Sequence, residues 1–416
     1  MDIVIARCCG LDVHQGSITA CVLLDGRQRP RKLIRTFRTM RAELEELRDW
    51  LKSLAVTHAA FEGTGVYWMP LYSVLEGHFD VSVVNARHVK QLPGRKTDVN
   101  DSEWLATLLR HGLLRKSFIP SREIRALRDM TRYRRMLVQS ATAEKNRLVK
   151  LLEMAGIKLS SVLSDVFGKS GMDMIRALAA GNVALEGIVQ MARKRLRKKL
   201  PDLRLALDVL IDEHHRVMLR DQLARLDRTS EEIAHYDGLL AELAKPYEEH
   251  LALLCSIDGI QRIAAIEIFA EVGPNLSSFP SDGHFSSWAG TCPGQHESAG
   301  KHRKTRRRRG NPYLQSILVE CALAATRKKG TYLKDKYHRL RARRGTMRAL
   351  FAVAHKLCRA VYRVLTSKTP HEDLGDAYLD RRNSKAVARN LVARLQRLGF
   401  DAAAVAGLFT QTTPST

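Results

Sequence analysis

The chain has 416 residues, enough for two or three domains with their own apolar cores. Lys and Arg number 69 against 44 Asp and Glu, which gives a formal net charge of +25 and favours a polyanionic partner, nucleic acid first. No apolar run approaches the roughly 20 residues that span a bilayer, and the start MDIVIARCCGLDV is too short in its apolar part for a secretory signal. We therefore expect a cytoplasmic protein without a membrane partner. Seven cysteines without a C-x-x-C pair predict neither a disulfide framework nor a zinc knuckle.

Residues 1–115 predict an α/β domain with the order βββαβαβα. Three short β-rich runs come first, IVIARCCGLDV, ITACVLL and KLIRTFR, separated by the turn segments HQGS and DGRQRP. A helical stripe follows in AELEELRDWLKSL. After it we expect the strand THAAFE, a helix from about Tyr67 to Glu76, the strand DVSVVN, and a helix from about Asn100 to Gly112.

Four acidic residues stand out in this region: Asp12, Glu62, Asp98 and Asp101. Asp12 belongs to the first strand and Glu62 ends the fourth, so both can project toward the same edge of a sheet. Asp98 and Asp101 are three residues apart, which places them on one face of a first helical turn. Helix capping explains that pair, but it does not explain all four acids. The group is either a divalent-metal site acting on phosphodiesters or a set of solvated surface acids.

Residues 116–250 are predicted to be almost wholly helical. One long, basic, amphipathic helix runs through REIRALRDMTRYRRMLVQSATAEKNRLVKLLEMAG and ends at Gly156. Apolar residues then recur at spacings of three and four from Leu219 to Leu243, and Lys245-Pro246 ends that pattern. A helical hairpin or a coiled-coil arm fits, and the heptads do not decide between packing within the chain and homo-oligomerisation. The run MARKRLRKKL is either a solvated face or a phosphate contact.

Residues 251–365 begin with a pattern similar to a helix-hairpin-helix motif, in which a turn at Gly259 and the next helix offer N–H groups to a phosphate. Gln261 stands where that motif has a second glycine, and a plain helix start with Asp258 as N-cap is the alternative. Further on, the stretch from Lys301 to Arg363 holds 20 Lys or Arg against two acidic residues. It fits phosphate neutralisation, with interleaved tyrosines for stacking, better than a disordered tail. The expected nucleic-acid contacts are Lys301, Arg303, Lys304, Arg306, Arg307, Arg308 and Arg309.

Three blocks carry a family resemblance: GLDVHQ, FEGTGVYWMPLY and GRKTDVNDSEWLATLLRHGLL. They resemble the acidic blocks of the DEDD-type transposases of the insertion-sequence one-ten family, whose N-terminal domain is similar to a RuvC-type Holliday-junction resolvase. Asp12, Glu62, Asp98 and Asp101 match that family's metal-binding quartet, which implies Mg²⁺ as cofactor. Gln15 departs from the pattern, because a Lys is common there.

The C-terminal half carries a second part of the same resemblance. WAGTCPGQHESAGK followed by GNPYL is similar to the family's C-terminal domain, and Ser298, in a small-residue loop, matches its nucleophilic serine. Ala299 replaces a common Gly and Gln315 a common Arg. Without the resemblance, a serine beside small residues is most often a turn residue.

The resemblance implies a DNA recombinase that excises and inserts an insertion sequence, guided by a bridge RNA that pairs with donor and target DNA. It also implies that two subunits build the active site, so we expect a homo-oligomer, a dimer or tetramer. The expected fold class is α/β plus α. It comprises an RNase H-like (RuvC-like) mixed sheet in 1–115, a helical and coiled-coil middle in 116–250, a mainly helical transposase domain in 251–365, and a tail in 366–416 with one short helix and no assigned role.

Two other functions remain compatible with the sequence. A structure-specific Holliday-junction-type endonuclease would use the acidic quartet alone and would make Ser298 dispensable. A non-catalytic nucleic-acid-packaging protein would need only the charge, and its binding would fall steeply with salt.

Overall fold

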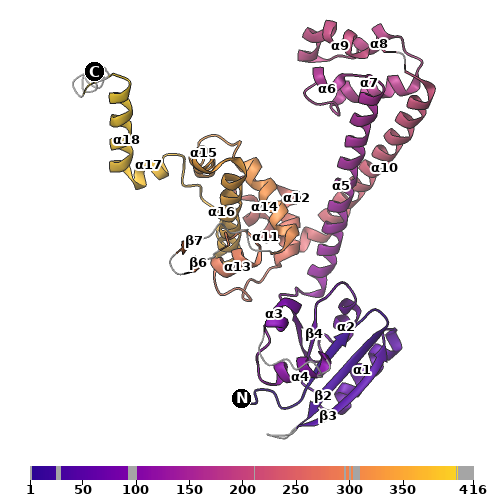
Figure 1. Ribbon diagram of the computed structural model, residues 1–416, viewed down its shortest axis with the longest axis vertical. Coiled ribbons are helices and arrows are strands. Elements are labelled where there is room, and N and C mark those ends of the chain that lie inside the picture. Colours follow the sequence, from indigo (N-terminus) through magenta and orange to yellow (C-terminus); the bar gives the residue numbers. More distant parts are fainter. Residues whose placement is uncertain are drawn as a thin grey trace. The chain divides into compact units, whose positions relative to one another are not determined.

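The computed structural model describes residues 2–24, 30–91, 101–209, 211–294, 297–298, 301–302, 310–399 and 401. The chain divides into two compact units, Met1–Ile119 and Pro120–Thr416 (Figure 1). Within the described ranges, no helix combines the length and the apolar character that crossing a membrane requires.

The first unit is built on a five-stranded mixed sheet with the strand order β3-β2-β1-β4-β5. Its first three strands are antiparallel neighbours, and β4 and β5 continue the sheet parallel to β1. The strands are β1 (Cys8–Val13), β2 (Ser17–Leu24), β3 (Arg31–Arg38), β4 (His58–Glu62) and β5 (Asp80–Val84). The helices are α1 (Arg41–Ser53), α2 (Trp68–Leu75), α3 (Ala86–Gln91) and α4 (Asp101–Arg110). The predicted order is confirmed apart from α3, an additional short helix after β5.

Both faces of the sheet are covered by helices. On one face, α1 and α2 bury leucines against strand residues such as Leu11 and Phe61, because strand side chains alternate between the two faces. On the other face, Ala106 and Leu109 of α4 pack against Cys8 and Ala60. Together with the helical remainder of the chain, this mixed sheet confirms the predicted fold class of α/β plus α.

The second unit begins with a long helical hairpin, which we call the arm. α5 (Arg122–Met154) and α10 (Glu213–Ala244) lie side by side along it (Figure 1). Gly156, in the left-handed conformation at φ 78°, follows the end of α5 as predicted. Leucines of α10 such as Leu219 and Leu223 are buried within the chain, whereas Leu243 is 45% exposed. Packing within the chain therefore accounts for most of the predicted heptad stripe.

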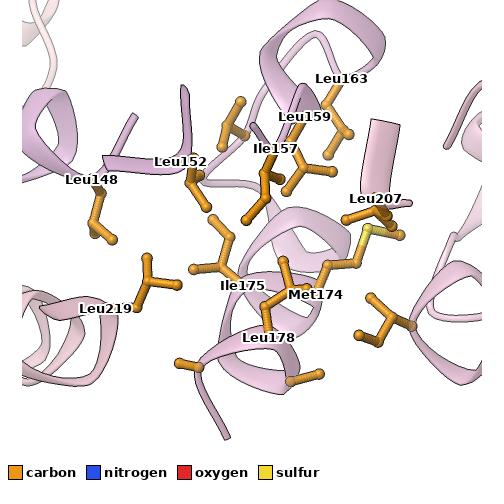
Figure 2. Close-up of a cluster of buried hydrophobic side chains, with 14 of the residues drawn as sticks. Leu148, Leu152, Ile157, Leu159, Leu163, Met174, Ile175, Leu178, Leu207 and Leu219 are labelled. Atoms are coloured by element: carbon orange, nitrogen blue, oxygen red, sulfur yellow. The ribbon is translucent and has the colours of Figure 1, made fainter. Parts of the chain in front are cut away.

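Short helices cover the end of the arm. They are α6 (Leu159–Val162), α7 (Lys169–Ala180), α8 (Leu185–Val189), η1 (Lys194–Lys199) and α9 (Leu200–Leu207). Figure 2 shows the apolar core that they share with the arm, where side chains from α7 meet Leu148 and Leu152 of α5 and Leu219 of α10. The basic run in η1 contributes no fully buried residue, although Leu196 packs partly against this core. Exposure of its Lys and Arg fits both predicted roles, a solvated face and a phosphate contact.

The remaining described helices of the second unit follow the arm, and α11 to α16 pack together as a bundle. They are η2 (Lys245–Tyr247), α11 (Glu248–Cys255), α12 (Arg262–Val272), α13 (Asp282–Trp288), α14 (Pro312–Ala325), α15 (Tyr332–Arg344), α16 (Thr346–Ser367), α17 (Tyr378–Arg382) and α18 (Ser384–Arg397). The prediction of one short helix in the tail is wrong. α17 and α18 form two helices separated by Asn383 at a non-helical φ of −139°, and α18 buries no residue.

The alternative of Asp258 as a helix N-cap is also wrong. α12 begins four residues later, after Gln261, and the Asp258 carboxylate accepts a hydrogen bond from Lys328 instead. Gly259, at φ 90°, has a packing role, because a Cβ there would lie 2.4 Å from the carbonyl oxygen of Cys321 in α14.

Candidate active site

The register of β1 and β4 brings two of the four predicted acids together. The two strands pair in parallel from Cys8–His58 to Leu11–Phe61, and the next residues along them are Asp12 and Glu62. Register partners on parallel strands project from the same face of a sheet. Asp12 and Glu62 therefore lie side by side at the carboxyl ends of β1 and β4.

A glycine brings the third acid to the same place. Gly10 lies two residues before Asp12 and hence on the same face; a Cβ at Gly10 would lie 2.1 Å from the Ser102 carbonyl oxygen. Farther along, the Cys8 thiol contacts the Ala106 carbonyl oxygen at 3.4 Å. α4 thus runs opposite to β1 and directs its first residue, the exposed Asp101, toward the Asp12 end.

Asp12 has one described side-chain partner at this edge. His14 Nε2 lies 3.2 Å from an Asp12 oxygen, and the Asp12 side chain is 27% exposed. Asp98 lies outside the described residues. The donor set of the other three acids, carboxylate oxygens only, fits a hard cation such as Mg²⁺.

The carboxylate oxygens of Asp12, Glu62 and Asp101 do not all lie within 4.8 Å of one another. Within the described ranges, the one trio whose ligand atoms all lie within 4.8 Å of one another is Asp212, His214 and His215 at the start of α10. Adjacent histidines gave no such signal in the sequence, and this trio is far along the chain from the quartet. The acids at the sheet edge are close by register, and their role as metal ligands stays a prediction.

Ser298 lies in a two-residue strand, where a loop was predicted. β6 (Glu297–Ser298) pairs with β7 (Lys301–His302) so that Ser298 is the register partner of Lys301. For these four residues the structure describes the backbone alone. Arg303, Lys304 and Arg306 to Arg309 lie outside the described residues, so their predicted nucleic-acid contacts stay predictions.

The chain segments before and after the Ser298 region meet. The Asn311 N–H donates to the Trp288 carbonyl oxygen at 3.0 Å, and a Cβ at Gly310 would lie 2.2 Å from the Gly290 nitrogen. Gln315, where the family has a common Arg, donates to the Gly290 carbonyl oxygen. These contacts define what we call the loop base, formed by residues 288–291 and 310–315.

Gly10→Ala tests the approach of α4 to the sheet. We expect the added methyl group to displace α4, lowering unfolding stability by about 1–3 kcal/mol and reducing DNA cleavage because Asp101 moves with the helix. Thermal unfolding and a cleavage assay measure both effects. Gly16→Ala is the matched control, since a Cβ there meets nothing within 4 Å. Equal stability of the two variants would contradict the close packing.

Comparison with known proteins now identifies the family. A model of the DEDD transposases of the IS110 (insertion-sequence one-ten) family, described as Transposase, matches residues 9–156. A second model, described as Transposase IS116/IS110/IS902 family, matches residues 251–338. The first match contains the sheet with Asp12, Glu62 and α4, and the second contains Ser298 and the loop base. No curated protein matches the chain. The chain therefore belongs to the IS110 family of transposases, enzymes that cleave DNA and transfer its strands.

Proposed function

We propose that this transposase excises and inserts an insertion sequence, using a metal site of four acids and Ser298 as nucleophile. The metal ligands are Asp12, Glu62, Asp98 and Asp101. The observation that supports this most is the arrangement of the sheet edge. The β1–β4 register and the close approach of α4 to Gly10 direct three of the four acids toward the same edge of the sheet.

The acids at the sheet edge would hold Mg²⁺. Carboxylate oxygens suit this cation, which keeps some of its waters and binds phosphate oxygens as well. When bound, the metal supplies Lewis-acid stabilisation of the charge that develops on the scissile phosphate. The nearby carboxylates repel one another without a cation, so cation binding also stabilises the sheet edge. His14, 3.2 Å from Asp12, orients one carboxylate oxygen.

Ser298 would form a covalent ester with the DNA phosphate, which keeps the energy of the broken phosphodiester bond available for rejoining. Its Oγ attacks the phosphorus, the bond from phosphorus to one bridging oxygen of the DNA strand breaks, and that oxygen leaves as a hydroxyl after taking up a proton. The remaining phosphoserine ester is then attacked by the hydroxyl of another strand end, which rejoins DNA and releases the serine. The Lys301–Arg309 segment would neutralise phosphates beside it.

The active site would be composite, because the acids and Ser298 belong to different units of the chain. The family resemblance supports a dimer or tetramer in which one subunit completes the site of another. It also supports a bridge RNA that pairs with donor and target DNA. If the RNA reads the sequence by base pairing, the protein needs to recognise only the backbone and shape of the nucleic acid and not its base edges. A concentrated cationic segment suits such backbone contacts.

The experiment that tests this function expresses the full chain together with the DNA that flanks its gene, so that any RNA encoded there is present. We expect purified protein to carry a specific RNA and to exchange strands between donor and target DNA in Mg²⁺ but not in EDTA. Cleavage without rejoining would favour the junction endonuclease. Salt-sensitive binding without any strand exchange would favour the packaging protein.

A further inference from the structure

Glu271 in α12 is a buried carboxylate with a complete set of donors. The residue is 1% exposed. Arg132 of α5 donates to both carboxylate oxygens, from Nε at 2.8 Å and from Nη2 at 2.9 Å. Asn311 donates to the same carboxylate from Nδ2 at 2.6 Å. Because a buried carboxylate without partners is costly, this geometry is strongly constrained.

Asn311 uses the two ends of its side-chain amide for separate tasks. Its Oδ1 accepts the N–H groups of Tyr313 at 3.0 Å and Leu314 at 3.1 Å, which caps the start of α14. Its Nδ2 donates to Glu271. The guanidinium of Arg132 also lies over the Tyr313 ring, 4.1 Å from its centroid. Cap and carboxylate together fix the orientation of the Asn311 amide.

The same asparagine belongs to the loop base, through which the chain enters and leaves the Ser298 region. The Asn311 backbone N–H donates to the Trp288 carbonyl oxygen, and Gly310, the residue before Asn311, packs against Gly290. A Cβ at either Gly290 or Gly310 would displace the backbone of the other glycine. The contact between Glu271 and Asn311 is therefore one of those that fix the loop base relative to α12 and the arm. Arg135 of α5 adds hydrogen bonds to Ser316 and Glu320 of α14.

We propose that Glu271 and Asn311 are a positioning pair that holds the loop base, and through it Ser298, in place for attack on DNA. The inference rests on the proposed role of Ser298. Arg132 extends the connection to α5, so that the arm and the loop base are anchored on one buried carboxylate. A displacement of about 1 Å in a nucleophile can cost about 10²-fold in rate, which is the effect expected from loosening this anchor.

Three single variants separate this role from helix capping. Asn311→Ser keeps an oxygen that can cap α14 but removes the donor to Glu271. Asn311→Asp keeps the cap and sets a carboxylate against Glu271. Glu271→Gln leaves one acceptor oxygen where Arg132 and Asn311 donate to two, so its N–H₂ group faces either the Asn311 amide or the Arg132 guanidinium. The double variant, Asn311→Asp with Glu271→Gln, restores the hydrogen bond between the two positions with donor and acceptor exchanged. Its total charge equals that of the unmodified chain, and the amide oxygen still accepts from Arg132 Nε.

The measurement is the rate of covalent protein–DNA adduct formation at saturating DNA from the element's own locus, with DNA affinity and thermal unfolding of each full-length variant. We expect each single variant to lose about 10²-fold in rate with near-normal DNA affinity. Asn311→Ser should unfold near the normal temperature, whereas Asn311→Asp and Glu271→Gln should unfold at lower temperatures, because they disturb a buried carboxylate and its donors. The double variant should recover much of the rate. Asp237→Asn is the control, since it removes an ion pair between Asp237 of α10 and Arg134 of α5 in which neither Glu271 nor Asn311 takes part. Its rate should be normal.

Each other outcome decides against the pair. Normal rates in the single variants, or a double variant no faster than they are, overturn the proposal. So does a loss of rate no larger than the unfolded fraction at the assay temperature or the lowered affinity accounts for, because that indicates a structural role only. If Ser298→Ala still forms the adduct, the proposed nucleophile is wrong and the inference falls with it. If Ser298→Ala is inactive while Asn311→Ser is normal, the inference alone fails.

Discussion

Asp12→Asn should abolish DNA cleavage and strand transfer while leaving the fold intact. The substitution removes a negatively charged oxygen ligand from the sheet edge and leaves a neutral amide of the same shape. Loss of several kcal/mol of metal-dependent stabilisation corresponds to a fall of at least about 10³-fold in the rate of cleavage. A gel assay with labelled donor DNA in Mg²⁺ measures the cleavage rate.

A second readout of Asp12→Asn does not depend on activity. Ligands that bind only the folded state raise the unfolding temperature, so Mg²⁺ should stabilise the unmodified chain more than the variant. In EDTA the variant should be as stable as the unmodified chain or slightly more so, because one of several neighbouring negative charges is gone. Thermal unfolding with and without Mg²⁺ provides both comparisons.

Asp49→Asn is the matched control for this prediction. Asp49 is an exposed acid of the same unit, on α1, paired with the adjacent Arg48. Its loss should change neither cleavage nor the effect of Mg²⁺, since exposed ion pairs contribute little to stability. Full activity of Asp12→Asn would contradict both the recombinase and the junction-endonuclease mechanisms, because both use this carboxylate.

Much of the first unit could be predicted because its signals are local. Each strand is a short β-rich run bounded by turn residues, and the apolar residues of α1 recur at helical spacing. The neighbouring positions of Asp12 and Glu62 follow from two strand ends in one parallel pair. α3 was missed because six residues, ARHVKQ, carry too little periodicity to distinguish a helix from a loop.

The contacts that depend on distant residues could not be predicted. Arg132 meets Glu271 across 139 positions and Asn311 meets it across 40, which no local pattern encodes. One signal was available, because Glu267 and Glu271 stand four apart in the otherwise apolar IAAIEIFAEV, and buried acids need partners. Burial raises the pKa of Glu267 despite the opposing effect of Arg135 and Arg134. The N-cap prediction at Asp258 failed likewise, because Lys328 binds that carboxylate.

Ser298→Ala should eliminate the covalent protein–DNA adduct and strand exchange while DNA binding is retained. The change removes only the hydroxyl oxygen that would carry the phosphate, so the cationic segment and the metal site keep their contacts. Loss of a nucleophile typically costs about 10⁴-fold or more, which places strand exchange below detection. Adduct trapping under denaturing conditions, followed by peptide mapping of the phosphorylated serine, measures the result.

Ser278→Ala is the control for the nucleophile, since Ser278 is an exposed serine of the same unit. Its adduct yield should be normal. An adduct that persists in Ser298→Ala, or that maps to another residue, would show that Ser298 is not the nucleophile. If Ser298→Ala cuts DNA at the normal rate and the unmodified chain forms no adduct, water is the nucleophile. The quartet would then act alone, as in a junction endonuclease, because only a covalently held strand end can be rejoined without a new energy source.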